Sequence, residues 1–443
     1  MMKNNAVSLI FLLMLFCFSC KKSDSSSSDG KTGDNGSSYN QRSGDVTLSG
    51  KTYNSSKGGI SAVNVTGGTL NLSGSTVSSS GNSSSTDSSS FYGLNAVILA
   101  YASSGNATIN SSDNKVSSSG TGANGIFAYG SAIITTTGDK FTHTGGGGHA
   151  IMCSGGGTIT VKNDTAVTSG GSSSAIATDR GGGTISVTGG VYTASGSNSA
   201  AIYSTGEITC TDATLVATGA EALVIEGSNR ILLNNCSVKS TYNKWGAMLY
   251  QSMSGDASGV KGYLTITGGS FTYTGTDGGM FYNTNSTAHI TLNGVTLVNS
   301  CDTLLRCIKG SWGASSASSG GMTYFVARNQ TLSGIFHIDK NSNADISLLE
   351  ASTFTGAVNK SNTANNVALT MDSNSSWIVT ASSYINGLIF NPGITGTEVS
   401  NITGNGNNVY YKSSANSSLG EKTYTLINGG YLMPDSPVNK AAY

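Results

Sequence analysis

A segment of about 25 residues recurs through most of the chain, and this internal repeat constrains the fold more than any other feature. Each copy opens with a Gly or polar residue, continues as an alternating apolar and polar stretch, and ends in two further short stretches rich in Val, Ile and Thr. Self-similarity at a fixed period of about 20 to 50 residues is typical of solenoids and other repeat architectures. The apolar residues that lead successive copies are Ile133, Ile159, Ile185, Ile208, Ile231, Leu264 and Ile290.

Three short strand-forming stretches per repeat, with no helical period, predict an all-β solenoid. Alternation with a period of two places Ile159 and Val161 inside, while Thr158 and Thr160 face water. Because one repeat cannot bury its apolar face alone, successive repeats must stack on one another. We therefore expect a right-handed parallel β-helix with about 25 residues per three-strand coil.

The boundaries follow from where the repeat begins and weakens. The β-helix is expected over residues 45–413, with about thirteen coils stacked at about 4.8 Å each. The last segment, 414–443, is expected to be a C-terminal cap, since a solenoid must cover its final edge. An unlike second domain after residue 330 is the alternative.

Composition excludes one large class of partners. Lys and Arg total 23, Asp and Glu also total 23, and charged residues make up only 10% of the chain. A protein that binds nucleic acid needs a basic surface to neutralise phosphates, so no nucleic-acid partner is expected. The apolar share of 37% still supplies a substantial core.

The N-terminus has the features of an export signal. An apolar run from Ala6 to Phe18 is too short to span a bilayer and ends at Ser19-Cys20. A small residue before a Cys at this place resembles the bacterial lipoprotein signal. The resemblance implies that Cys20 is lipidated and that the protein is an outer-membrane lipoprotein of the cell envelope, either surface-exposed or facing the periplasm.

This interpretation divides the N-terminal region in two. Residues 1–19 are the signal peptide, and the Ser/Gly-rich stretch 20–44 is a flexible tether. Cleavage near Ser19 without lipidation, or an uncleaved anchor, are the alternatives.

The cysteines and histidines predict no metal site. The five cysteines that remain once Cys17 is removed and Cys20 is acylated contain no Cys-x-x-Cys motif, and the chain has only four His residues, which argues against structural zinc. No cofactor is expected. The remaining cysteines are predicted to be buried free thiols, with a Cys301–Cys307 disulfide as the alternative: Cys153, Cys210, Cys236, Cys301 and Cys307.

Four stretches carry a resemblance to a known group of proteins: Ala222–Gly227, Leu233–Val238, Met248–Asp256 and Met280–Asn285. The chain resembles exported bacterial right-handed β-helix proteins that are described as adhesin-like or carbohydrate-binding. The resemblance covers residues 45–400 and implies the fold, whereas activity must be argued from a site. Some relatives hold Ca²⁺ through Asp-Asp pairs in the third strand, but this chain lacks those pairs.

Alignment of the third strands by their Gly predicts an outward column of polar residues. Rings stack on apolar sugar faces, and amides, carboxylates and hydroxyls pair with sugar hydroxyls, so this column is the candidate glycan-binding face. The alternative is that these polar residues merely alternate outward. The column is Tyr129, Ser154, Asp179, Thr205, Glu226 and Gln251, with Trp245 and Tyr250 beside it.

The same column is the place to look for catalysis. Asp179 and Glu226 lie two coils apart, about 9.6 Å along the stack, at the edge of the separation used by inverting glycosidases. Thr205 interrupts the pair, and no adjacent residue is expected to raise a carboxyl pKa. We therefore predict no catalytic residues, with a polysaccharide lyase or glycosidase of the pectin-lyase-like type as the alternative.

Other outward positions also repeat. Glu207 and Arg230 precede the leading Ile of consecutive coils and are expected to form a surface ion pair. Thr158, Thr160, Thr265, Thr267 and Thr291 are expected to form cross-strand threonine ladders.

Together these features predict a non-catalytic, lipid-anchored rod. We expect it to bind a polysaccharide or another cell-surface ligand along one face, through contacts repeated from coil to coil. A structural envelope protein without a ligand is the remaining alternative. The predicted ligand-binding residues are Tyr129, Asp179, Glu226, Trp245, Tyr250 and Gln251.

Overall fold

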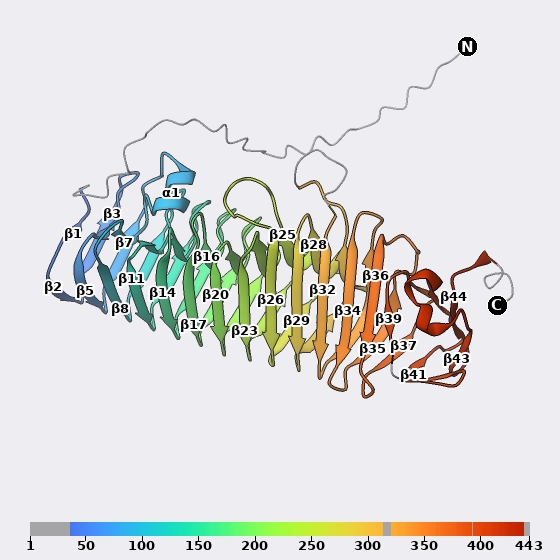
Figure 1. Ribbon diagram of the computed structural model, residues 1–443. Coiled ribbons are helices and arrows are strands. Elements are labelled where there is room, and N and C mark those ends of the chain that lie inside the picture. The colour runs from blue at the N-terminus through green and yellow to red at the C-terminus, as the bar shows by residue number, and fades with distance from the viewer. Residues whose placement is uncertain (1–35, 313–319, 392, 438–443) are drawn as a thin grey trace, which may run out of the picture.

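The computed structural model describes residues 36–312, 320–391 and 393–437. They form a parallel β-helix of about 16 turns with roughly 25 residues per turn, which confirms the predicted fold class (Figure 1). The prediction of about thirteen coils was too low. At about 4.8 Å per turn the rod is about 75 Å long.

Three sheets form the walls of the rod, and all but two short pairings between neighbouring strands are parallel. The first, sheet A, has 20 strands in the described residues. They are β1 (Tyr39–Gln41), β4 (Val63–Val65), β7 (Ile98–Ala102), β10 (Ile126–Gly130), β13 (Ile151–Ser154), β16 (Ile176–Thr178), β19 (Ile202–Ser204), β22 (Leu223–Glu226), β25 (Trp245–Tyr250), β28 (Gly279–Thr284), β31 (Thr303–Cys307), β33 (Thr331–Ile338), β35 (Thr353–Val358), β37 (Ser376–Val379), β38 (Ser383–Ile385), β40 (Ile394–Thr395), β41 (Glu398–Thr403), β42 (Val409–Tyr411), β43 (Tyr424–Ile427) and β44 (Tyr431–Pro434).

Sheet B has 14 strands and faces the viewer in Figure 1. They are β2 (Asp45–Ser49), β5 (Gly68–Ser73), β8 (Ala107–Ser112), β11 (Ile133–Thr137), β14 (Gly157–Lys162), β17 (Gly183–Thr188), β20 (Glu207–Thr211), β23 (Arg230–Asn234), β26 (Lys261–Thr267), β29 (Thr287–Asn293), β32 (Met322–Arg328), β34 (Asn343–Leu349), β36 (Asn366–Met371) and β39 (Ile389–Phe390).

Sheet C has 10 strands and ends before the other two sheets do. They are β3 (Thr52–Ser55), β6 (Thr76–Ser79), β9 (Lys115–Ser118), β12 (Lys140–His143), β15 (Thr165–Thr168), β18 (Val191–Ala194), β21 (Thr214–Ala217), β24 (Ser237–Ser240), β27 (Ser270–Tyr273) and β30 (Thr296–Asn299). The repeat continues beyond residue 330 in sheets A and B, as β34 and β36 pair in register.

The predicted alternation of inside and outside residues is confirmed in sheet B. Ile159 and Val161 are buried, whereas Thr158 is half-buried and Thr160 exposed. One position was wrong: Ile134, not Ile133, pairs with Ile159, and Ile133 points outward with 48% of its surface exposed. Two adjacent Ile residues made the leading position ambiguous. A shift of one residue along a strand moves a side chain to the opposite face of the sheet.

Large aromatic side chains fill the core of the C-terminal half. They form a column in which successive ring centroids lie 5.1 to 5.9 Å apart, mostly edge to face, the geometry that aromatic pairs favour. The column consists of Phe271, Phe281, Phe325, Phe336, Phe354 and Trp377, all fully buried.

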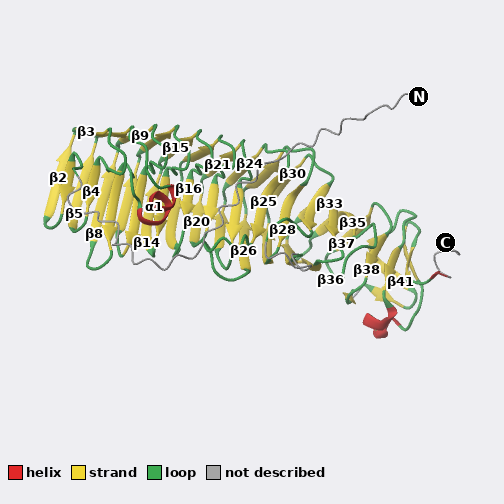
Figure 2. Cartoon of the chain, turned by 90° about the horizontal axis from the view of Figure 1, so that it is seen from above, coloured by secondary structure: helices red, strands yellow, loops and turns green. Residues whose placement is uncertain are grey.

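One α-helix lies outside the solenoid wall. Helix α1 (Thr86–Tyr92) begins after Ser85, whose hydroxyl accepts from the Ser88 N–H, and it ends at Gly93 in the left-handed conformation. The sequence does not predict this helix, because the Ser-rich stretch has no apolar period of 3.6. Figure 2 shows α1 lying over sheet A near β16.

Both ends of the solenoid differ from its body. Strand β1 lies within the stretch expected to be a tether and pairs with β4. Within the stretch expected to be a cap, the described part has two 3₁₀ helices, η1 (Ser413–Ala415) and η2 (Ser417–Leu419), and β43 pairs antiparallel with β44.

The predicted signal peptide and Cys20 lie outside the described residues. Of the helices in the part of the chain that is described, none combines the length and the apolar character needed to cross a membrane.

Candidate functional site

The outer face of sheet A carries the polar column that the sequence predicted. Tyr129 pairs in register with Ser154, as expected. Glu226, however, pairs with Tyr250, so Gln251 is one residue out of the predicted column. The alignment matched Ala222 with Ala247, whereas Leu223 is the residue paired with Ala247.

This column is covered and does not face open solvent, which corrects the sequence-based prediction. Glu226 is 1% exposed, Asp179 8% and Gln251 2%. Two insertions lie over it: α1 with its flanking residues, and residues 251–260, which we call the strap. The spacing of 33 residues between the leading residues Ile231 and Leu264, against 23 or 26 elsewhere in that series, indicates an insertion at the strap but does not show that it folds back onto the column.

Glu226 is held by hydroxyl groups from the sheet and from the strap. Its Oε2 accepts hydrogen bonds from Tyr203 at 2.6 Å and from Tyr250 at 2.8 Å. Its Oε1 accepts from Ser252 and, at 3.5 Å, from Ser254 of the strap. These hydroxyl donors satisfy the hydrogen-bonding capacity of the buried Glu226 carboxyl group.

Asp179 lies in the same face, in an environment that disfavours its charge. Burial and, to a smaller extent, the nearby Asp256 and Glu226 carboxylates raise the pKa of its carboxyl to about 7. The Arg180 N–H donates to Asp179 Oδ1 at 2.7 Å, which partly offsets this effect. The expectation that no neighbour would raise a carboxyl pKa here was therefore wrong.

Arg180 joins the two insertions. Its guanidinium lies 3.9 Å from the centroid of the Phe91 ring in α1. Its Nη2 donates to Asp256 Oδ1 of the strap at 3.2 Å. Ser154 adds a hydrogen bond to the Phe91 carbonyl at 2.7 Å, so α1 and the strap are both fixed to sheet A.

Gln251 shapes the strap. Its Nε2 donates to the carbonyls of Ala257 at 3.1 Å and Gly259 at 2.6 Å, and its Oε1 accepts from the Met253 N–H at 2.8 Å. A buried amide used in this way is a structural residue, so its predicted ligand-binding role is not supported by its position.

The aromatic residues of the predicted face are engaged with one another. Tyr129 stacks on Tyr101 with centroids 4.5 Å apart, and Trp245 stacks on Tyr282 at 4.0 Å. Trp245 is only 7% exposed. Tyr250 packs against Trp312 at 5.3 Å. A sugar needs an open ring face to stack on, and these contacts occupy the faces of Tyr129 and Trp245.

Sheet B presents a different surface, which is flat and open. From β2 to β17 the outward side chains form three columns that run across the strands in register. All are Ser, Thr or Asn except Asp45, Ile133 and Lys162. In Figure 1 no labelled element crosses this face.

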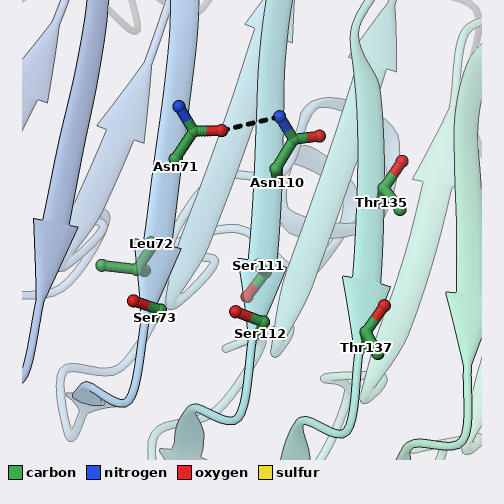
Figure 3. Close-up of a pocket in the computed structure, with 8 residues that line it drawn as sticks. All are labelled: Asn71, Leu72, Ser73, Asn110, Ser111, Ser112, Thr135 and Thr137. Carbon is green, nitrogen blue, oxygen red and sulfur yellow. Dashed lines mark hydrogen bonds between the residues drawn. The ribbon is translucent and has the colours of Figure 1, made fainter.

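A shallow groove of about 320 Å³ lies in this face, where β5, β8 and β11 run side by side. Asn110 Nδ2 donates to Asn71 Oδ1 at 2.8 Å (Figure 3). Asn71 Nδ2 in turn donates to Thr47 Oγ1 at 3.5 Å. The groove is lined by Asn71, Leu72, Ser73, Asn110, Ser111, Ser112, Thr135 and Thr137.

The sequence predicted outward threonine ladders, but this groove was not among the predicted sites. Thr158 pairs with Ile133 and Thr160 with Thr135, so the expected ladder continues into the Asn71–Asn110 columns. The sequence pattern that could have predicted the groove was the set of uncharged outward residues Thr69, Asn71 and Ser73, which recurs as Thr108, Asn110 and Ser112.

The predicted Glu207–Arg230 ion pair is confirmed, at 3.7 Å.

The cysteines and acidic groups offer no metal centre within the described residues, where no three His, Cys, Asp or Glu side chains are placed to hold an ion. The five described cysteines are buried free thiols, as predicted, and Cys301 and Cys307 are not bonded to each other. Burial raises the pKa of the Cys307 thiol to about 11.

Comparison with known proteins adds no assignment: no family model, no curated protein and no solved structure matches this chain.

Proposed function

We propose that this protein is a non-catalytic, lipid-anchored rod of the cell envelope that binds a glycan or another surface ligand along one face of the β-helix. The observation that carries the proposal is the outer face of sheet B, where uncharged hydrogen-bonding side chains repeat in register from turn to turn. Anchoring is supported by the signal-like N-terminus with Cys20.

The repeated face favours weak contacts summed over many turns. Each Ser, Thr or Asn offers a hydrogen bond of modest net value, since water competes for the same groups. A polymer that contacts several turns at once makes later contacts intramolecular, which raises its overall affinity. A rigid rod is suited to this mode because its spacing is fixed by the stacked strands.

A glycan array probed with the full chain tests the proposal. We expect saturable binding to at least one class of polysaccharide. The binding should depend little on NaCl, since few charges lie on this face from β2 to β17. Absence of binding to every glycan would contradict the glycan ligand and favour a protein-binding adhesin or a structural rod.

A polysaccharide-cleaving enzyme is the second candidate. It is favoured by Asp179, whose pKa of about 7 suits a general acid, on the same face as the hydrogen-bonded Glu226. Incubating any bound glycan with the protein and measuring new reducing ends or unsaturated products tests it. Products that form with the parent chain and disappear with Asp179→Asn would establish catalysis and overturn the non-catalytic proposal.

A further inference from the structure

The chemical groups that line the groove on sheet B restrict the class of ligand that can bind there. Its lining offers amide and hydroxyl groups, each able to donate and to accept, and no charged side chain. In Figure 3 the Asn110 oxygen points away from Asn71, toward the strand that carries Thr135. This arrangement matches a ligand whose hydroxyls both donate and accept.

Charge sets a second limit. The outward positions of β5, β8 and β11 are uncharged, and Lys162 on β14 is the first basic side chain on the C-terminal side of the groove. A polymer of uronic acids or phosphates would bring a dense row of negative charge to a surface where Lys162, which pairs with Thr137 of the groove, is the single basic side chain of these columns from β2 to β17. The groove therefore favours a neutral polymer over an anionic one.

The direction of the ligand follows from the repeat. Along a strand such as β8 only three side chains point outward before the chain turns. Across the strands, equivalent positions recur at about 4.8 Å for many turns. The hydrogen bonds from Asn110 to Asn71 and from Asn71 to Thr47 run in this second direction.

We propose that the groove formed by β5, β8 and β11 is the binding subsite for a neutral, hydroxyl-rich polysaccharide chain that lies along the axis of the rod. This inference rests on the proposed glycan-binding function and adds the place, the ligand class and the orientation. Asn71 and Asn110 are the central binding residues, because their amides supply both donors and acceptors in the lining of the groove.

The test uses the full chain, the double variant Asn71→Ala/Asn110→Ala and the matched variant Asn234→Ala. Asn234 is an exposed outward residue on β23 of the same sheet, outside the groove. The probes are a neutral galactomannan, a neutral β-glucan, an arabinoxylan and anionic polygalacturonate, measured by affinity electrophoresis and titration calorimetry. Circular dichroism verifies that each variant is folded.

We expect a neutral polysaccharide to bind the parent chain and the Asn234 variant equally, and to bind the double variant at least about tenfold more weakly, a loss of about 1.4 kcal/mol. Equal binding to all three chains would overturn the subsite while leaving the glycan-binding function standing. Selective binding of polygalacturonate would overturn the neutral ligand class. Failure of every glycan to bind the parent chain would overturn the function and the inference with it.

Discussion

Replacing Asp164 by Asn is expected to stabilise the β-helix at pH 8 and to leave its stability almost unchanged at pH 4. Asp164 is fully buried at the corner between sheets B and C, one turn after Asp139. Burial and, to a smaller extent, the Asp139 carboxyl raise the pKa of Asp164 to about 7. Burial likewise raises the pKa of Asp139 to about 6.

The magnitude follows from the difference between the folded and unfolded pKa. A carboxyl with a pKa of about 7 when folded and 3.8 when unfolded binds more protons in the folded state between these pH values. Stability therefore falls as pH rises from 4 to 7, and the full penalty is about 4 kcal/mol above pH 7. At pH 4 the penalty is less than about 1 kcal/mol.

Asn is the suitable replacement because the chain already uses it at this corner. Asn114 occupies the equivalent place one turn before Asp139, and its Oδ1 accepts from the Ser75 N–H just as Asp164 Oδ1 accepts from the Asp139 N–H. Among the described residues, Asp164 Oδ2 and the neighbouring Thr136 Oγ1 lack well-formed hydrogen bonds. In the Asn variant an amide nitrogen replaces Oδ2, and this nitrogen can donate to Thr136 Oγ1, so that both buried atoms gain a partner.

Urea denaturation followed by circular dichroism at pH 4 and pH 8 measures the effect. The reciprocal variant Asn114→Asp should lose stability at pH 8, and Asp113→Asn, which removes an exposed carboxylate, is the control. If Asp164→Asn shifts the denaturation midpoint equally at both pH values, or lowers it at pH 8, the reasoning from the buried charge is refuted.

Three further predictions concern other parts of the molecule. Asp256→Asn removes the ion pair with Arg180 and should increase protease cleavage within the strap, whereas Glu350→Gln, which breaks the pair with Arg328 several turns further along the rod, should not. Phe325→Ala removes a ring from the buried aromatic column and should cost about 3–5 kcal/mol in urea denaturation, with Tyr324→Ala, 38% exposed, costing much less. Cys20→Ser should release the protein from the membrane fraction of cells, and continued membrane association would contradict lipid anchoring at this residue.

The candidate site was only partly predictable from sequence. Alternation placed Asp179 and Glu226 correctly on the outer side of one sheet, because side chains on a strand alternate between faces. Their burial depends on α1 and the strap, and neither has a periodic pattern that shows where it folds. Gln251 was displaced from its predicted place by a one-residue difference in register, which reverses the direction of a side chain.

The sequence by itself determined the solenoid. The sequence repeats about every 25 residues, and within each repeat apolar residues such as Ile159 and Val161 alternate with outward Thr residues. Only the stacking of one turn on the next buries all of these apolar side chains. The tertiary structure decided which face is open. Arg180 joins α1 to the strap across sheet A, while sheet B keeps its Asn and Thr columns uncovered from β2 to β17. These contacts join residues 91, 180 and 256, and no local pattern specifies which distant segments pack together.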